Sequence, residues 1–166
     1  MSNARVLTLA ETLDACLKET VKAAKAVPPS AHLNQIKEGK ATPLWLVGHL
    51  ANTLNTVLWT WTFGQKPLFD HEFAYNFAPD FAKGKPITAN PADYPSMEKV
   101  IEAYKAVGTK VIELAKSLDD SALPEAPRGN IPEDFKGFFS SIGVVLTIMI
   151  LHDSHHRGQL VMLGKL

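Results

Sequence analysis

Apolar residues recur every three or four positions along four stretches of the chain, residues 8–27, 42–63, 96–118 and 140–164. This spacing gathers apolar side chains on one side of a helix, whereas a half-buried strand would alternate apolar and polar residues. The connecting stretches contain prolines, glycines and polar residues but no convincing strand. The pattern predicts an all-α protein, a four-helix bundle with long, partly ordered crossover loops, and residues 1–166 are short enough to form a single domain.

Residues that cap helices stand at the starts of these four stretches. The pair Thr42–Pro43 combines a side-chain cap with a proline whose missing N–H is not needed in the first turn. Ser96 precedes the third stretch, and Ser140 or Ser141 precedes the fourth. Thr8 begins a possible capping box, although the first helix can also start one turn earlier. These signals predict where each helix begins.

Residues 65–95 differ from the other connections because they combine five prolines with six aromatic residues. The segment is too apolar for a disordered linker and too often interrupted for a long helix. We expect an ordered excursion that covers one end of the bundle, either to close the core or to act as a lid over a substrate. Its His71 is an outside candidate for a functional site.

The second stretch carries a histidine where an apolar residue is expected. His49 lies in the inward stripe, with Asn52 about one turn further on and Trp45 one turn before it. Tryptophans at this spacing are more often packing residues than walls of a pocket. The stripe comprises Leu46, His49, Leu50, Thr53, Leu54, Val57, Leu58 and Trp61.

Three histidines lie within five residues near the C-terminus, between two apolar runs. His152 and His156 are four positions apart, so on a helix their imidazoles can reach the same point, and His155 falls in the same arc. Burying so many polar groups is costly unless something binds them. The pair predicts two metal ligands, and a catalytic zinc commonly has three protein ligands. His49 is the best candidate for the third because it lies in a strongly periodic segment, whereas His32 and His71 lie in connections.

The composition narrows the range of partners. Seventeen basic residues balance seventeen acidic ones, which argues against a nucleic-acid or anionic-membrane surface and favours a small molecule or a second copy of the chain. The single cysteine rules out an intramolecular disulfide and suits the cytoplasm. The most apolar run, residues 138–151, is too short to span a bilayer. No secretory signal is evident at the N-terminus.

The run His152-Asp153-Ser154-His155-His156-Arg157-Gly158-Gln159, together with Trp45-Leu46-Val47-Gly48-His49, resembles the DinB superfamily of metal-binding four-helix bundles. The resemblance covers essentially the whole chain. It implies three metal ligands at His49, His152 and His156, a divalent ion such as nickel or zinc, and a homodimer. Relatives include YfiT-like hydrolases, thiol S-transferases and maleylpyruvate isomerase, some of which use a low-molecular-weight thiol.

These observations lead to the expectation of a divalent-metal-dependent enzyme acting on a small molecule, by thiol transfer or by hydrolysis. Candidate catalytic or ligand-orienting residues are Asp153, His155 and Asn52, and candidate substrate-binding residues are Arg157, Trp45 and Gln159. Arg157 can equally brace the helix through salt bridges. The alternative from another class is a non-catalytic stress-response module that binds a metal or ligand without turnover.

A zinc peptidase is an enzymatic rival because His152 to His156 resembles the His-Glu-x-x-His motif. Aspartate replaces the glutamate in this chain and is one methylene shorter than the general base of that motif. The ten residues after His156 include no histidine or glutamate that could serve as a downstream third ligand. Both departures argue against a peptidase.

Overall fold

A computed structural model describes residues 2–166, and within that range the chain forms six α-helices and no strand. The all-α prediction is therefore confirmed, while the predicted count of four helices omitted two short ones. The long helices are α1 (Ala4–Ala26), α2 (Pro43–Thr53), α4 (Met97–Lys116) and α6 (Ile142–Leu163), and the short ones are α3 (His71–Phe77) and α5 (Glu133–Lys136). No helix in residues 2–166 combines the length and the apolar character required to cross a membrane.

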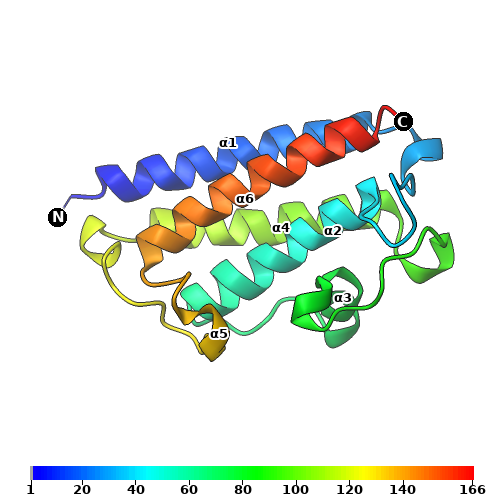
Figure 1. Ribbon diagram of the computed structural model, residues 1–166. Coiled ribbons are helices and arrows are strands. Elements are labelled where there is room, and N and C mark those ends of the chain that lie inside the picture. The colour runs from blue at the N-terminus through cyan, green and yellow to red at the C-terminus, as the bar shows by residue number, and fades with distance from the viewer. Residues whose placement is uncertain (1) are drawn as a thin grey trace.

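The long helices pack along one another in two directions (Figure 1). Helices α1 and α6 lie side by side and run the same way, whereas α2 and α4 run the opposite way. Because α2 and α4 are neighbours that run in the same direction, the connection between them must return along the bundle. The segment between α2 and α4 makes this return and contains α3, which packs against α2.

The helices begin largely where their capping residues predict. The side chains of Thr42, Ser96 and Ser141 each accept a hydrogen bond from the backbone N–H three residues on. The first helix is an exception, because it starts at Ala4 and the hydroxyl of Thr8 donates to the Ala4 carbonyl instead of capping. The predicted capping box was therefore wrong, and the earlier start is correct.

Helix α2 continues without a break into a π-helical segment, η2 (Leu54–Thr62). Val57 and Leu58 of the predicted inward stripe are buried, as predicted. A π-helix has more residues per turn than an α-helix, so the stripe is not kept at every later position. Asn55 is buried and accepts a hydrogen bond from the backbone of Leu68, while Trp61 is only partly buried. The wider turn thus directs Trp61 away from the core centre.

A glycine on α2 allows α3 to approach closely. A Cβ atom at Gly48 would lie 2.2 Å from the ring of Phe77, which is fully buried. Only a residue without a side chain fits there, and Phe77 is the last residue of α3. The close contact fixes the end of α3 beside the His49 turn of α2.

Helix α6 is apolar over most of its circumference but is not fully buried. Val145, Leu146 and Met149 belong to the core, whereas Leu151 and Met162 are 64% and 68% exposed. The helix is therefore not completely buried. Its core side chains meet α1, whose close packing to α6 is one of the main contacts of the fold.

Candidate metal centre and its cavity

The side chains of His49, His152 and His156 meet between α2 and α6. The Nε2 atom of His152 lies 3.3 Å from Nε2 of His49 and 3.2 Å from Nε2 of His156. These are the three residues whose ligand atoms lie within 4.8 Å of one another. The structure thus brings together residues separated by more than a hundred positions, as the sequence predicts.

Hydrogen bonds to Nδ1 of His49 and of His156 determine which nitrogen of each ring carries the proton. Nδ1 of His49 lies 3.1 Å from the Phe77 carbonyl oxygen, and Nδ1 of His156 lies 2.7 Å from Oε1 of Gln159. Since both oxygens are acceptors, each Nδ1 donates its proton to them. The Nε2 atoms of His49 and His156 therefore present lone pairs toward His152.

All three imidazoles are held neutral. Burial is the main cause that lowers the pKa of His49 to about 4, with a further contribution from His156. Burial likewise lowers the pKa of His152 to about 3 and also lowers that of His156. Neutral rings keep their lone pairs at pH 7, which is the form that binds a metal ion.

The arrangement of these nitrogens fits a divalent metal ion. His152 has at most one proton on Nε2, so it can donate to His49 or to His156 but not to both. The Nε2 lone pair of the other histidine is then left without a donor unless a cation lies among the nitrogens. Two nitrogens bound ~2.1 Å from one tetrahedral ion lie ~3.4 Å apart. The two separations that involve His152, 3.3 and 3.2 Å, agree with that value, and all three ligand atoms lie within 4.8 Å of one another.

Two predicted candidates on α2 help to shape the site. The Trp45 ring stacks on the His49 ring with centroids 4.8 Å apart and planes at 6°, and its indole N–H donates to the Asn76 carbonyl. Asn52 is buried and donates to the Ala74 carbonyl. Both residues face the cavity beside the histidines. Trp45 holds the His49 ring plane, while Asn52 links α2 to α3.

Asp153 lies on the opposite face of α6 from the histidines, within the core. Its carboxylate accepts hydrogen bonds from Thr20 on α1, at 2.7 Å, and from Tyr104 on α4. Burial raises the pKa of Asp153, and the two hydroxyl donors act in the opposite direction. The structure therefore places Asp153 away from the cavity, in contact with neighbouring helices.

The remaining predicted residues of α6 lie around the histidines but not among the ligands. His155 is exposed, and its ring packs edge-on against His156 with centroids 5.1 Å apart. Arg157 donates to the Cys16 carbonyl and so braces α6 against α1, by a hydrogen bond to the backbone instead of the salt bridges given as the alternative. Gln159 is exposed and orients the His156 ring.

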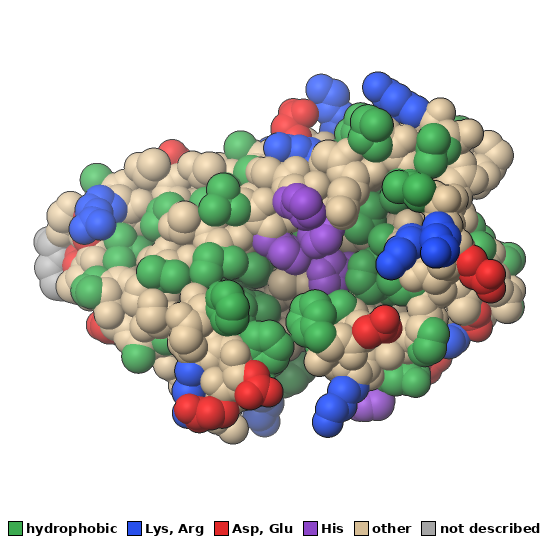
Figure 2. All heavy atoms as spheres, viewed as in Figure 1, with side chains coloured by type: hydrophobic (Ala, Val, Ile, Leu, Met, Phe, Trp, Pro, Cys, Tyr) green, Lys and Arg blue, Asp and Glu red, His purple; other side chains and the backbone are tan. Residues whose placement is uncertain are grey.

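The three histidines form one wall of a cavity of about 650 Å³. Figure 2 shows histidine side chains gathered in the middle of one face, next to a hollow bordered by hydrophobic side chains. The opposite walls are formed by residues of η2, of α3 and the turn after it, and of α5, together with Phe139. His71 is also among the lining residues, so the excursion at 65–95 helps to enclose the site.

Several lining residues were not singled out from the sequence. These are Phe81, Phe135 and Phe139, together with the Phe77 carbonyl that orients His49. The aromatic content of residues 65–95 was the available signal for Phe81. No pattern links it to residues 135 and 139, which lie in another connection.

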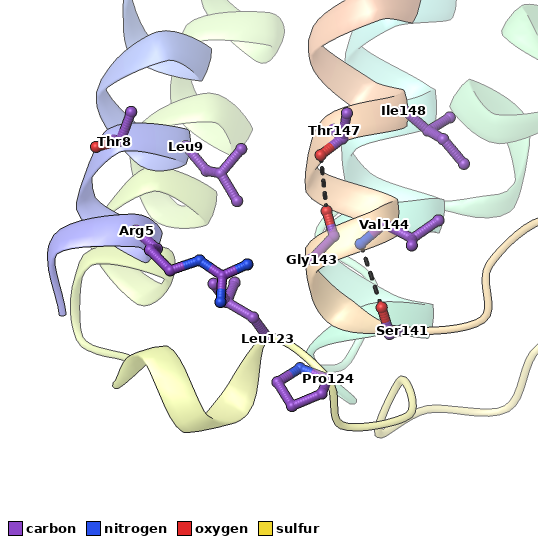
Figure 3. A pocket seen from close by; sticks show the side chains of 10 residues that line it. All are labelled: Arg5, Thr8, Leu9, Leu123, Pro124, Ser141, Gly143, Val144, Thr147 and Ile148. Atoms are coloured by element: carbon purple, nitrogen blue, oxygen red, sulfur yellow. Dashed lines mark hydrogen bonds between the residues drawn. The ribbon is translucent and has the colours of Figure 1, made fainter. Parts of the chain in front are cut away.

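A second hollow, of about 720 Å³, lies between the first halves of α1 and α6 (Figure 3). Its walls include Leu9, Leu123 and Val144, with the guanidinium of Arg5 extending across it. None of its described lining residues belongs to a cluster that could hold a metal ion. Size alone therefore does not identify the functional site, and the histidines do.

The fold and the site define an all-helical protein with three convergent histidines suited to a divalent metal ion. The sequence profile of the DinB superfamily matches residues 12–160. The chain therefore belongs to the DinB superfamily, as its motifs predicted. No curated protein and no solved structure matches the chain significantly.

Proposed function

We propose that the chain is a divalent-metal-dependent enzyme that acts on a small molecule in the histidine-lined cavity, by thiol transfer or by hydrolysis. The observation that carries this proposal is the convergence of three neutral Nε2 atoms on one wall of an accessible cavity. A purely structural metal site is normally closed by four protein ligands, whereas three ligands leave a position for water or substrate. The volume of about 650 Å³ suits a small molecule.

The residues of the chain position the ligands and shape the space beside them. The Phe77 carbonyl and Gln159 fix the tautomers of His49 and His156, and Trp45 fixes the plane of the His49 ring. When bound, a divalent ion supplies Lewis acidity, which allows a water or thiol nucleophile to lose its proton near neutral pH. The apolar walls limit the access of bulk water to that nucleophile.

Three imidazole ligands suit zinc or nickel, so we propose one of these as the cofactor. A low-molecular-weight thiol is the proposed co-substrate for the transfer reaction. We also propose a cytoplasmic homodimer, in which a second copy covers part of the exposed apolar surface of α6. The 64% and 68% exposure of Leu151 and Met162 supports this interface.

The metal site is tested by the metal content of purified protein after chelation and reloading with zinc or nickel. We expect about one ion per chain, and loss of that ion in His49→Ala, His152→Ala and His156→Ala. The matched control is His32→Ala, because His32 lies in the connection between α1 and α2, outside the cavity. Unchanged metal content in all three site variants would show that the assignment is wrong.

Turnover is tested with the metal-loaded protein. Thiol-dependent consumption of 1-chloro-2,4-dinitrobenzene tests transfer, and release of nitrophenol from small nitrophenyl esters tests hydrolysis. We expect one of these activities to require both the metal and an intact His152. A protein that binds one metal ion per chain but consumes neither substrate class supports the non-catalytic binding module instead.

A further inference from the structure

We infer that the cavity selects a small molecule with an aromatic or similarly flat apolar body and a negatively charged group, and that Lys83 at the cavity wall recognises this charge. The inference deepens the proposed function, since it concerns the same cavity, but the binding that it predicts can be measured without turnover. The inference rests on two properties of the cavity walls opposite the histidines, their aromatic side chains and the charge of Lys83.

The aromatic wall is assembled from three separate segments. Trp61 lies in the last turn of η2, Phe135 lies in α5, and Phe139 follows α5. The ring centroids are 5.7 Å apart for Trp61 and Phe135 and 6.1 Å apart for Trp61 and Phe139. Phe81, on the turn after α3, lies 6.3 Å from Phe135. None of these rings belongs to the buried core. They form a surface on which a flat apolar group can stack.

Phe81 is the most solvent-exposed of these four aromatic residues. Its side chain is 77% exposed at a cavity wall. An exposed phenyl ring beside partly exposed aromatic rings forms an apolar patch that gains from covering by a ligand. The walls are therefore shaped for an apolar body, not for a sugar or a highly hydrated ion.

The charge of the cavity is one-sided. Lys83 lines it, and no aspartate or glutamate is found among its described lining residues. Lys83 takes part in none of the ion pairs within residues 2–166. The cavity wall thus offers a lysine and no carboxylate to a ligand. This balance favours a negatively charged group.

The backbone at Lys83 provides an independent reason to examine this residue. Lys83 has φ 58° and ψ 36°, and it is the one non-glycine residue with positive φ in the described chain. This left-handed conformation is unfavourable for a residue with a Cβ atom, and glycine or asparagine is preferred at such a position. A lysine there is a poor choice for the turn alone, which is consistent with a role for its amine.

The same conformation makes a sharp experiment possible. Lys83→Gly removes the amine and relieves the backbone strain, so it should leave the thermal midpoint unchanged or raise it. A loss of binding in this variant cannot then be attributed to unfolding. Lys83→Arg keeps the charge and serves as the conservative rescue.

The probes are 4-ethylbenzoate, its methyl ester and propionate, which separate the aromatic body from the charge. Binding is measured by ligand-observed NMR titration, first with metal-free protein, in which no metal ion competes with Lys83 for the carboxylate, and then with metal-loaded protein. For metal-free wild type we expect 4-ethylbenzoate to bind about 3-fold to 5-fold more tightly than the ester, as for an exposed ion pair. Propionate should bind more weakly than either.

Lys83→Gly should abolish the advantage of the acid over the ester without changing binding of the ester, and Lys83→Arg should restore the advantage. Phe139→Ala should weaken the acid and the ester alike. Equal binding of acid and ester to wild type, or an equal loss of both in Lys83→Gly, would overturn the role of Lys83. Propionate binding as tightly as 4-ethylbenzoate would overturn the aromatic selection.

The two proposals fail separately. If the histidine variants retain the metal content of wild type but the probes behave as expected, the metal centre is wrong and the cavity selectivity stands. If the metal binds as expected but acid and ester are not distinguished, the proposed function stands and this inference is wrong.

Discussion

Two neighbouring residues of α6, His152 and Asp153, show how differently the protein treats polar groups on the two faces of one helix. The Asp153 carboxylate is buried between helices and receives hydrogen bonds from Thr20 and Tyr104. The His152 ring faces the cavity, where its Nε2 meets nitrogen lone pairs of two other histidines. The chain supplies a donor to each oxygen of the Asp153 carboxylate, whereas it does not supply enough donors for the nitrogens around His152.

This difference separates a structural polar cluster from a ligand site. A buried group that the protein itself satisfies stabilises the packing of particular helices. A group of converging acceptors that lacks protons is stabilised only when something positive binds. Asp153 is buried and His152 is partly buried, but what distinguishes the two sites chemically is whether the chain itself supplies their hydrogen-bond partners.

The largest expected effect is the stabilisation of the histidine face by metal. At a free metal concentration 1,000 times the dissociation constant, binding to the folded state adds ~4 kcal/mol to the free energy of unfolding. His152→Ala should remove this increment. Urea denaturation with and without zinc measures it. An identical increment in the variant would mean that the ion binds elsewhere.

The opposite face should respond only to the loss of its own hydrogen bonds. Asp153→Ala leaves the Thr20 and Tyr104 hydroxyls without their acceptor and should cost about 3 kcal/mol in the metal-free protein. Asp153→Asn keeps an acceptor oxygen and should cost less. The structural role of Asp153 would be contradicted if Asp153→Ala abolished metal binding while the metal-free variant kept wild-type stability in denaturant.

Lowering the pH should lower the free energy of unfolding of the metal-free protein, because His49 is buried in its neutral form. The folded-state pKa of His49 is about 4, below its ordinary value of 6.5, so the unfolded chain binds more protons as the pH falls. The stability linked to neutral His49 is therefore present above pH 6.5 and is lost progressively toward pH 4. Between pH 6.5 and 5 this ring should cost the metal-free protein ~1.5 kcal/mol.

Denaturation of metal-free protein at several pH values measures this loss. His49→Gln cannot titrate in this range and should reduce the pH dependence by that amount. A variant with the same pH profile as wild type would contradict the assigned shift at His49.

The smallest expected effect concerns the orientation of His156. Gln159→Ala removes the acceptor that holds Nδ1 of His156, and it should lower metal affinity about tenfold, toward the low end for an orienting residue because Gln159 is exposed. Competition with a chromogenic chelator measures the affinity. Gln159→Glu, which keeps an acceptor, should bind metal at least as well as wild type. Equal affinity in the alanine variant would show that the ring needs no such support.

Much of the fold could be predicted because helix formation depends on nearby residues. The caps at Thr42 and Ser96 and the apolar spacing of the long helices follow from hydrogen bonds and side-chain contacts within a few positions. The π-helical turn after Leu54 could not be read from the same spacing, which assumes 3.6 residues per turn. For that reason the predicted inward position of Trp61 was inaccurate.

The candidate site was predictable only in part. The interval of four between His152 and His156 and the apolar register of His49 indicated three ligands, since the geometry of a helix fixes both. The direction of Asp153 was not predicted, because it depends on where α1 and α4 pack against α6. The cavity walls were not predicted either, since Phe81 and Phe135 lie in connections whose positions no periodicity fixes.

The sequence by itself determined the helices, most of their starting points and which histidines can share one face, because these properties arise from local geometry. Only the tertiary structure decided that the Phe77 carbonyl would orient His49, that Asp153 would be satisfied inside the core, and that aromatic rings from separate connections would enclose the histidines. Those outcomes depend on contacts between segments far apart in the chain. Such contacts are selected by the packing of the whole molecule.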